Sequence, residues 1–132
     1  MQNYFGKDFV TIGYDKANHV VVLKWIVPPT SDEFREGLYS LLAALEHFKT
    51  GKIITDVSYL GTIHPNDQRW SATEWLQSAL KVGYSHIAII MPSDVFTQMS
   101  VEDTMNQVDS PLPSAYFDNM EAAFDWINSF KN

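Results

Sequence analysis

Residues 19–57 read HVVVLKWIVPPTSDEFREGLYSLLAALEHFKTGKIITDV, and this stretch decides the predicted fold. It begins with a β-branched run over 19–27, which two prolines end because proline cannot donate to a strand ladder. Apolar residues then recur at helical spacing over 30–51, and a second β-branched run follows over 52–57. Strand, helix and strand in this order predict two parallel strands joined by a crossover helix.

The helix over 30–51 carries start and stop signals of its own. Thr30 and Glu33 have the spacing of a capping box, in which each side chain binds the other residue's backbone N–H. Gly51 lies where a glycine commonly ends a helix in the left-handed conformation. These signals predict the boundaries of this helix better than those of any other in the chain.

On the N-terminal side, residues 4–14 form a strand-like mixture of apolar and polar residues. The turn-forming stretch 15–18, DKAN, connects it to the strand over 19–27. Two strands joined by so short a turn predict an antiparallel hairpin.

On the C-terminal side, strands and helices continue to alternate. We expect a helix over 65–82 with Pro65 in its first turn, a buried strand over 86–91, and a helix capped by Ser93 or Asp94 and broken near Ser100. A loop over 109–113 follows, then a short strand over 115–117 and a last helix opened by a second capping box over 118–121.

The predicted order is therefore β-β-α-β-α-β-α-β-α in a single domain spanning 1–132. Apolar residues on both faces of the later strands favour parallel pairing, because parallel strands are covered by helices on both sides. The predicted fold class is α/β, with a mixed and mostly parallel sheet that begins with an antiparallel hairpin.

Composition excludes several classes of function. The chain of 132 residues has no cysteine, which removes disulfides, thiolate catalysis and Cys-type metal sites. Its formal charge is −7 and its nine cations are scattered, so nucleic acid is not an expected partner. Its four histidines form no pair at metal-binding spacing, and its glycines form no nucleotide-binding motif, so no metal and no cofactor are predicted. An N-terminus without an apolar core and the lack of a long apolar run predict no membrane span and a cytoplasmic location.

Short motifs along most of the chain carry a family resemblance. They are the Trp25 strand, SDEFREGL over 31–38, ITDVS over 54–58, NDQRW over 66–70 and the closing YFD over 116–118. With the order of elements, these motifs resemble the SpoIIAA-like fold of STAS domains, and more closely small uncharacterised bacterial proteins of the STAS/SEC14-like type. The resemblance implies the fold and a tendency to bind proteins or small ligands near the N-terminus of the helix at 65–82.

The regulatory phosphorylation of STAS antagonists does not carry over. The family places its phosphorylated serine in an Asp-Ser-Ser-Gly stretch, and the matching region here, 62–67, reads TIHPND without a hydroxyl at that position. Ser58 and Thr62 lie outside the motif.

The loop over 58–70 is the candidate site, because ligands of open α/β sheets favour the carboxyl ends of parallel strands. We expect Trp70 to lie opposite the apolar stripe of its helix and to face solvent, a neighbouring loop or a partner, as a binding anchor would. The candidate binding residues are Asp56, Tyr59, His64, Asp67, Arg69 and Trp70, with no catalytic or metal-binding residue assigned. In the plainer interpretation, Asp56 binds loop backbone and Asp67 stabilises the first turn of its helix.

Three functions remain open at this point. The first is a non-catalytic protein-interaction or regulatory module without the STAS phosphoserine, which would bind a protein partner or a second copy of itself through this loop. The second is a carrier of a small apolar or lipid-like ligand between the sheet and residues 96–108. The third is an acid–base enzyme that uses His64 with Asp56 or Asp67.

Overall fold

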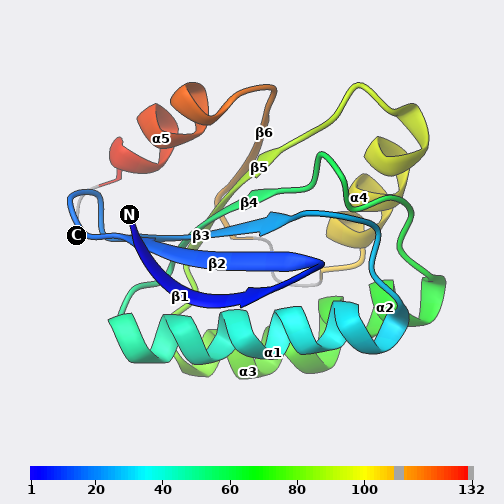
Figure 1. The fold of residues 1–132 in the computed structure, drawn as a ribbon, viewed down its shortest axis with the longest axis horizontal. Coiled ribbons are helices and arrows are strands. Elements are labelled where there is room, and N and C mark those ends of the chain that lie inside the picture. Colours follow the sequence, from blue (N-terminus) through cyan, green and yellow to red (C-terminus); the bar gives the residue numbers. More distant parts are fainter. Residues whose placement is uncertain (109–111, 131–132) are drawn as a thin grey trace.

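The computed structural model describes residues 1–108 and 112–130 of the chain. Its centre is one sheet whose six strands lie side by side in chain order (Figure 1). The strands are β1 (Gln2–Lys7), β2 (Val10–Asp15), β3 (Val20–Trp25), β4 (Lys52–Asp56), β5 (His86–Ile90) and β6 (Ser114–Phe117). The predicted α/β class is confirmed.

The N-terminal part of the sheet is antiparallel and contains one strand more than predicted. The prediction of a single strand over 4–14 is wrong, because residues 8 and 9 turn the chain and separate β1 from β2. This turn has none of the Asn-Gly or Asp-Gly signals that mark a two-residue hairpin in sequence. The second hairpin, β2 to β3, is as predicted, and Asn18 at its turn donates its backbone N–H to the Asp15 carboxylate at 3.2 Å.

The parallel half of the sheet agrees with the prediction. The pairs β3–β4, β4–β5 and β5–β6 are all parallel, and Leu23, Thr55 and Ile89 lie side by side across the three central strands. The carboxyl ends of β3 and β4 therefore point to the same edge, where the loops to the next helices begin.

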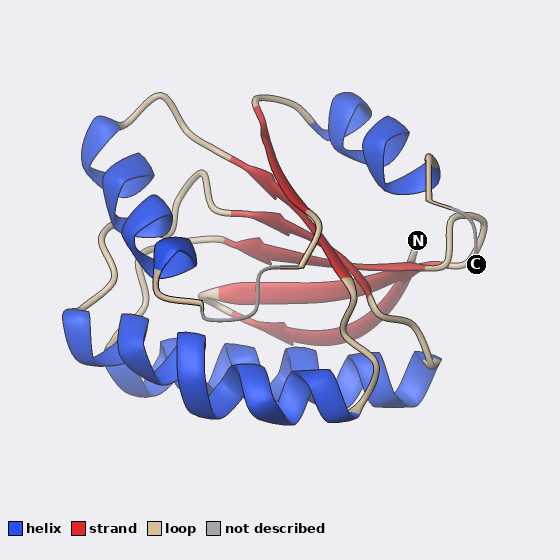
Figure 2. Ribbon diagram, turned by 180° about the vertical axis from the view of Figure 1, so that it is seen from behind, coloured by secondary structure: helices blue, strands red, loops and turns tan. Residues whose placement is uncertain are grey.

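Helices cover both faces of this sheet (Figure 2). One face carries α1 (Ser31–Phe48) and a continuous helical segment made of α2 (Pro65–Trp70), a π-helical turn η1 (Ser71–Trp75) and α3 (Leu76–Lys81). The other face carries α5 (Met120–Asn128), which packs on β4, β5 and β6. Helix α4 (Val95–Asn106) packs against α2 and η1.

The start of α1 follows the prediction and its end does not. Both hydrogen bonds of the capping box form, from Glu33 N to Thr30 Oγ1 and from Thr30 N to Glu33 Oε1. The left-handed residue after the helix is Lys49, with φ of 56°, and Gly51 is not in that conformation. Gly51 is needed for a close contact instead, because a Cβ there would lie 1.9 Å from the Gly83 carbonyl oxygen.

Two further helix predictions need correction. Helix α4 runs unbroken through Ser100, whose buried hydroxyl accepts the Ile63 backbone N–H at 2.7 Å. Its cap is Asp94, as predicted. Helix α5 has no capping box, because Asn119 caps it one residue later and binds Ala122 N.

The predicted loop over 109–113 lies partly outside the described residues. Within the described part of the chain, no helix combines the length and the apolar character that crossing a membrane requires.

Candidate functional site

Asp56 ends β4 and organises the loop that follows. Its Oδ1 accepts the Ser58 backbone N–H at 3.0 Å and the Ser58 hydroxyl at 2.6 Å. The carboxylate thus serves the turn of its own loop, which is the plainer of the two roles expected for it.

His64 acts as the N-cap of α2. Its ring Nδ1 accepts the backbone N–H of Asn66 at 3.1 Å, and the side chain is exposed. Among the described residues, no hydrogen bond joins this ring to Asp56 or Asp67, so the geometry gives no support to acid–base catalysis by these groups.

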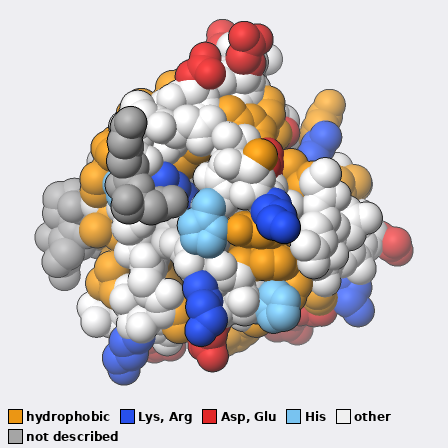
Figure 3. Space-filling model, turned by 90° about the vertical axis from the view of Figure 1, so that its left-hand side faces the viewer, with side chains coloured by type: hydrophobic (Ala, Val, Ile, Leu, Met, Phe, Trp, Pro, Cys, Tyr) orange, Lys and Arg blue, Asp and Glu red, His pale blue; other side chains and the backbone are white. Residues whose placement is uncertain are grey.

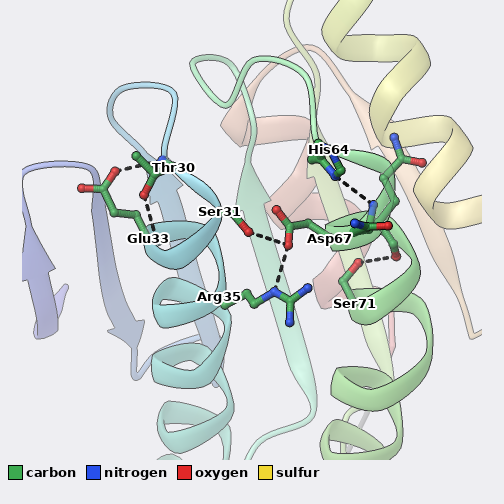
Figure 4. Close-up of polar contacts among 9 residues, drawn as sticks. Thr30, Ser31, Glu33, Arg35, His64, Asp67 and Ser71 are labelled. Atoms are coloured by element: carbon green, nitrogen blue, oxygen red, sulfur yellow. Dashed lines mark hydrogen bonds and ion pairs between the residues drawn. The ribbon is translucent and has the colours of Figure 1, made fainter.

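Asp67 is buried and joins α2 to α1 (Figure 4). Its Oδ1 accepts hydrogen bonds from the Ser31 hydroxyl at 2.9 Å and from Arg35 Nε at 2.8 Å. The pair with Arg35 is charge-assisted and lies at a helix–helix contact, where it fixes the distance between the two helices.

The expectation that Trp70 is exposed is wrong. Only 6% of Trp70 is accessible, because the Tyr39 ring packs edge-on against it at 5.3 Å and the Arg35 guanidinium lies 4.7 Å from its ring centre. Residues five apart point about 140° apart in an α-helix, and the wider π-helical turn η1 brings such residues closer to one face. Trp70 and Trp75 are both buried.

The remaining two candidates stay on the surface. Tyr59 is 61% exposed, and Arg69 is exposed as well. Of the six predicted residues, Tyr59, His64 and Arg69 are exposed, Asp56 binds the turn of its own loop, and Asp67 and Trp70 belong to the contact between α1 and α2.

A polar network anchors α4 to this loop. The Gln68 amide donates to Ile63 O at 3.0 Å and to the Ser100 hydroxyl at 3.3 Å, and its oxygen accepts from the Gln107 amide at 2.9 Å. Because Gln68 is buried and its amide is fully used, it holds α4 in one position over the helical face.

Beside this network lies an apolar cavity of about 160 Å³, here called the central cavity. Trp25, Thr55 and Ile89 line it from the sheet, and Phe34 and Leu38 from α1. The cavity therefore lies between α1 and the face of the sheet that α1 covers.

The other walls of the central cavity come from the later helices. Ala72 and Trp75 of η1 line it, with Tyr84 from the turn before β5. Helix α4 contributes Val101 and Met105. No lining residue in the described part of the chain is charged, so the cavity suits an uncharged, mainly apolar occupant.

A second depression, of about 220 Å³, adjoins the central cavity. Its polar rim includes Ser31, His64 and Asp67, and it shares the side chains of Phe34 and Ile63 with the central cavity. The predicted loop therefore lies directly above the apolar space.

The end of the sheet where β4 and β5 begin carries histidines and cations around small apolar areas (Figure 3). His19 contacts the Tyr14 hydroxyl and the Lys49 carbonyl oxygen. Burial and, to a smaller extent, the charge of Lys52 lower the pKa of His86. Across residues 1–108 and 112–130, no three His, Asp or Glu side chains converge in a way that could hold a metal ion.

Sequence reasoning missed the residues that carry this architecture. Ser31 and Arg35 bind Asp67 from 36 and 32 positions away, and no local pattern encodes such a pairing. The sequence did hold one signal for the cavity: the chain is rich in aromatic residues, and Trp25 and Phe34 are among those that line it.

Comparison with protein-family models, curated proteins and solved structures gives no match to this chain. The similarity to SpoIIAA-like and STAS proteins therefore stays a prediction based on the short motifs.

Proposed function

We propose that this protein binds a small, uncharged, mainly apolar molecule in the central cavity. The observation that supports the proposal is an apolar, partly open cavity of about 160 Å³ between the sheet and the helices on its α1 face. Protein interiors are close-packed, and spaces much larger than a water molecule are few. A concave, mainly apolar lining, with no charged side chain among its described residues, is of the kind that small-molecule sites have.

The volume of this space indicates the size of its occupant. Apolar cavities of about 150 Å³ stay dry and bind benzene, so a single-ring molecule has the right size.

Titration with toluene tests the proposal directly. We expect toluene to bind the wild-type protein with one site per chain, measured by calorimetry. Amide shifts in a ¹H–¹⁵N spectrum should concentrate on the residues around the cavity, such as Ala72 and Met105.

A matched pair of variants in one helical segment provides the control. Ala72→Leu places its added carbons in the cavity and should abolish toluene binding while leaving stability equal or higher. Ala79→Leu adds the same carbons at a fully buried position among close-packed neighbours. It should keep toluene binding and cost about 1–3 kcal/mol. A folded wild type that binds no toluene at millimolar concentration, or an Ala72→Leu protein that binds it unchanged, would refute the proposal.

A protein-interaction module is the second candidate, and the exposed aromatics favour it. Tyr59 lies on the predicted loop, and Tyr39 packs over Trp70 beside Arg35. Aromatic and arginine side chains are common anchors in interfaces. Sedimentation of the wild type and of Tyr59→Ser and Tyr39→Ser variants tests self-association: equal monomer mass for all three would remove that form of the proposal.

We infer further that the fold is SpoIIAA-like and that the chain belongs with small bacterial STAS-related proteins. Support comes from the quoted motifs and from the sequential order of parallel strands β3 to β6. A cytoplasmic location remains a prediction of the same kind.

A further inference from the structure

We propose that the central cavity selects single-ring aromatic molecules that carry one uncharged hydrogen-bonding group, as phenols do, and that the Tyr84 hydroxyl binds this group. The inference rests on the proposed function and specifies the class of ligand.

Tyr84 brings a hydroxyl to the central cavity. Only 7% of the residue is exposed, and it lines the central cavity. No hydrogen bond to its hydroxyl is found among residues 1–108 and 112–130. Among the same residues, every side-chain nitrogen or oxygen that is inaccessible to solvent, in a residue that is not exposed, has a hydrogen-bond partner. The Tyr84 hydroxyl therefore keeps some accessible area, and because Tyr84 lines the central cavity we infer that this area faces it.

Thr55 provides a second hydroxyl on the same cavity. It lies in the central strand β4, where Ile53 and Ile54 are fully buried, yet Thr55 itself is only half-buried. Because β3 and β5 flank it on both sides and it lines the cavity, its accessible area faces that space. Its hydroxyl, too, has no hydrogen-bond partner among the described residues.

These hydroxyls suit a neutral ligand rather than an anion. No lysine, arginine or histidine lines the described wall, so a carboxylate would enter without a counterion. Burial also raises the pKa of Tyr84, so its hydroxyl stays protonated at neutral pH and can both donate and accept.

The shape and chemistry of the walls favour an aromatic ring. Trp25 and Phe34 stack at 5.6 Å with their planes 14° apart, and the Trp75 and Tyr84 rings lie 5.8 Å apart. Aromatic neighbours add interaction energy beyond that of the buried area when a further ring packs offset or edge-on against them. The volume limits the ligand to about one ring.

A comparison of p-cresol with toluene tests this inference, because the two molecules differ by one hydroxyl. The wild type should bind p-cresol at least as tightly as toluene, although p-cresol loses hydration on entry. In Tyr84→Phe, which keeps the ring, the Kd of p-cresol should rise about tenfold while that of toluene changes less than about twofold. The anion 4-methylbenzoate should not bind either protein at pH 7. Calorimetry measures all three ligands.

Thr55→Val removes the other cavity hydroxyl with little change of shape, so it tests which of the two hydroxyls binds the polar group of the ligand. The rise in the Kd of p-cresol should be smaller in Thr55→Val than in Tyr84→Phe. Loss of p-cresol affinity in Thr55→Val but not in Tyr84→Phe would overturn the assignment of Tyr84. Toluene binding with equal p-cresol affinity in wild type and Tyr84→Phe would overturn this inference alone. Failure of both probes to bind the folded wild type would overturn the proposed function with it.

Discussion

The two faces of the sheet are built from the same strands but pack in different ways. At the centre of the α5 face, small and branched side chains meet: Ala88 and Ile54 of the sheet lie against Ala123 and Ile127, all fully buried, and the aromatic side chains on this face are only partly buried around them. On the α1 face, large aromatic side chains such as Trp25 and Trp75 meet, and the central cavity lies among them. Both faces are apolar, so hydrophobicity does not distinguish them. The shapes of the side chains decide whether the layer closes.

The comparison also separates two kinds of helix attachment. Helix α5 approaches the sheet closely through Ala123. Helix α4 packs on α2 and η1 instead and is held by the Gln68 amide network. A helix attached by polar bonds at one side leaves room beneath it, which is where Val101 and Met105 border the cavity.

The largest expected effect compares one deletion on each face. Ile54→Ala removes a side chain that is enclosed on the α5 face and should cost about 4 kcal/mol. Ile87→Ala removes the same atoms on the cavity face and should cost about 2 kcal/mol, because Ile87 lines the cavity, is 9% exposed and therefore has fewer contacts to lose. Urea unfolding measures both, and equal costs would contradict the difference between the faces.

An intermediate effect is expected from Gly37, where α1 touches the Trp25 indole. A Cβ at Gly37 would lie 2.6 Å from Trp25 Cη2, so in Gly37→Ala the ring must move, and because Trp25 lines the cavity we expect the ring to move into it. Stability should fall by no more than about 1–2 kcal/mol, because the gain in helix propensity offsets part of the overpacking. Toluene affinity should fall at least fivefold by calorimetry. Unchanged affinity would show that the indole moves elsewhere.

The smallest effect is a pH dependence confined to the α5 side. Burial, with help from Lys52, lowers the pKa of His86, whose ring lies 4.3 Å from that of Phe130. The unfolded chain therefore binds this proton more readily. The contribution of His86 to the free energy of unfolding is fully present above the pKa of about 6.5 that His86 has in the unfolded chain. It is lost as the pH falls through the lower pKa that His86 has in the folded protein.

Hydrogen exchange at pH 7 and pH 5.5 measures this effect. Acid should weaken protection in α5 slightly more than in α1, and His86→Gln should remove the difference between the two helices. Equal weakening of both helices in the wild type would contradict a local role for His86.

Local signals predicted much of this fold. Alternating strands and helices, the capping box at Thr30 and the turn at 15–18 all depend on residues close in sequence, where propensity and hydrogen bonding act directly. The strand β1 escaped prediction because it is an exposed edge strand with a polar pattern and an unmarked turn. Gly51 shows the limit of a local rule. A side chain is excluded at this position because the Gly83 carbonyl oxygen, which is remote in sequence, occupies the space of a Cβ.

The candidate site shows the same division more sharply. The position of the loop at 58–70 at the carboxyl edge of the sheet can be inferred without coordinates, because strand order and direction follow from the order of elements. The burial of Trp70, the pairing of Asp67 with Arg35 and the cavity beside Trp25 become visible only in the three-dimensional packing. A π-helical turn, a pairing between helices and a void all depend on how separate surfaces fit together. The types of residue along the chain specify which surfaces of the helices and strands are apolar. How closely these surfaces fit depends on the positions that the elements take in the folded protein.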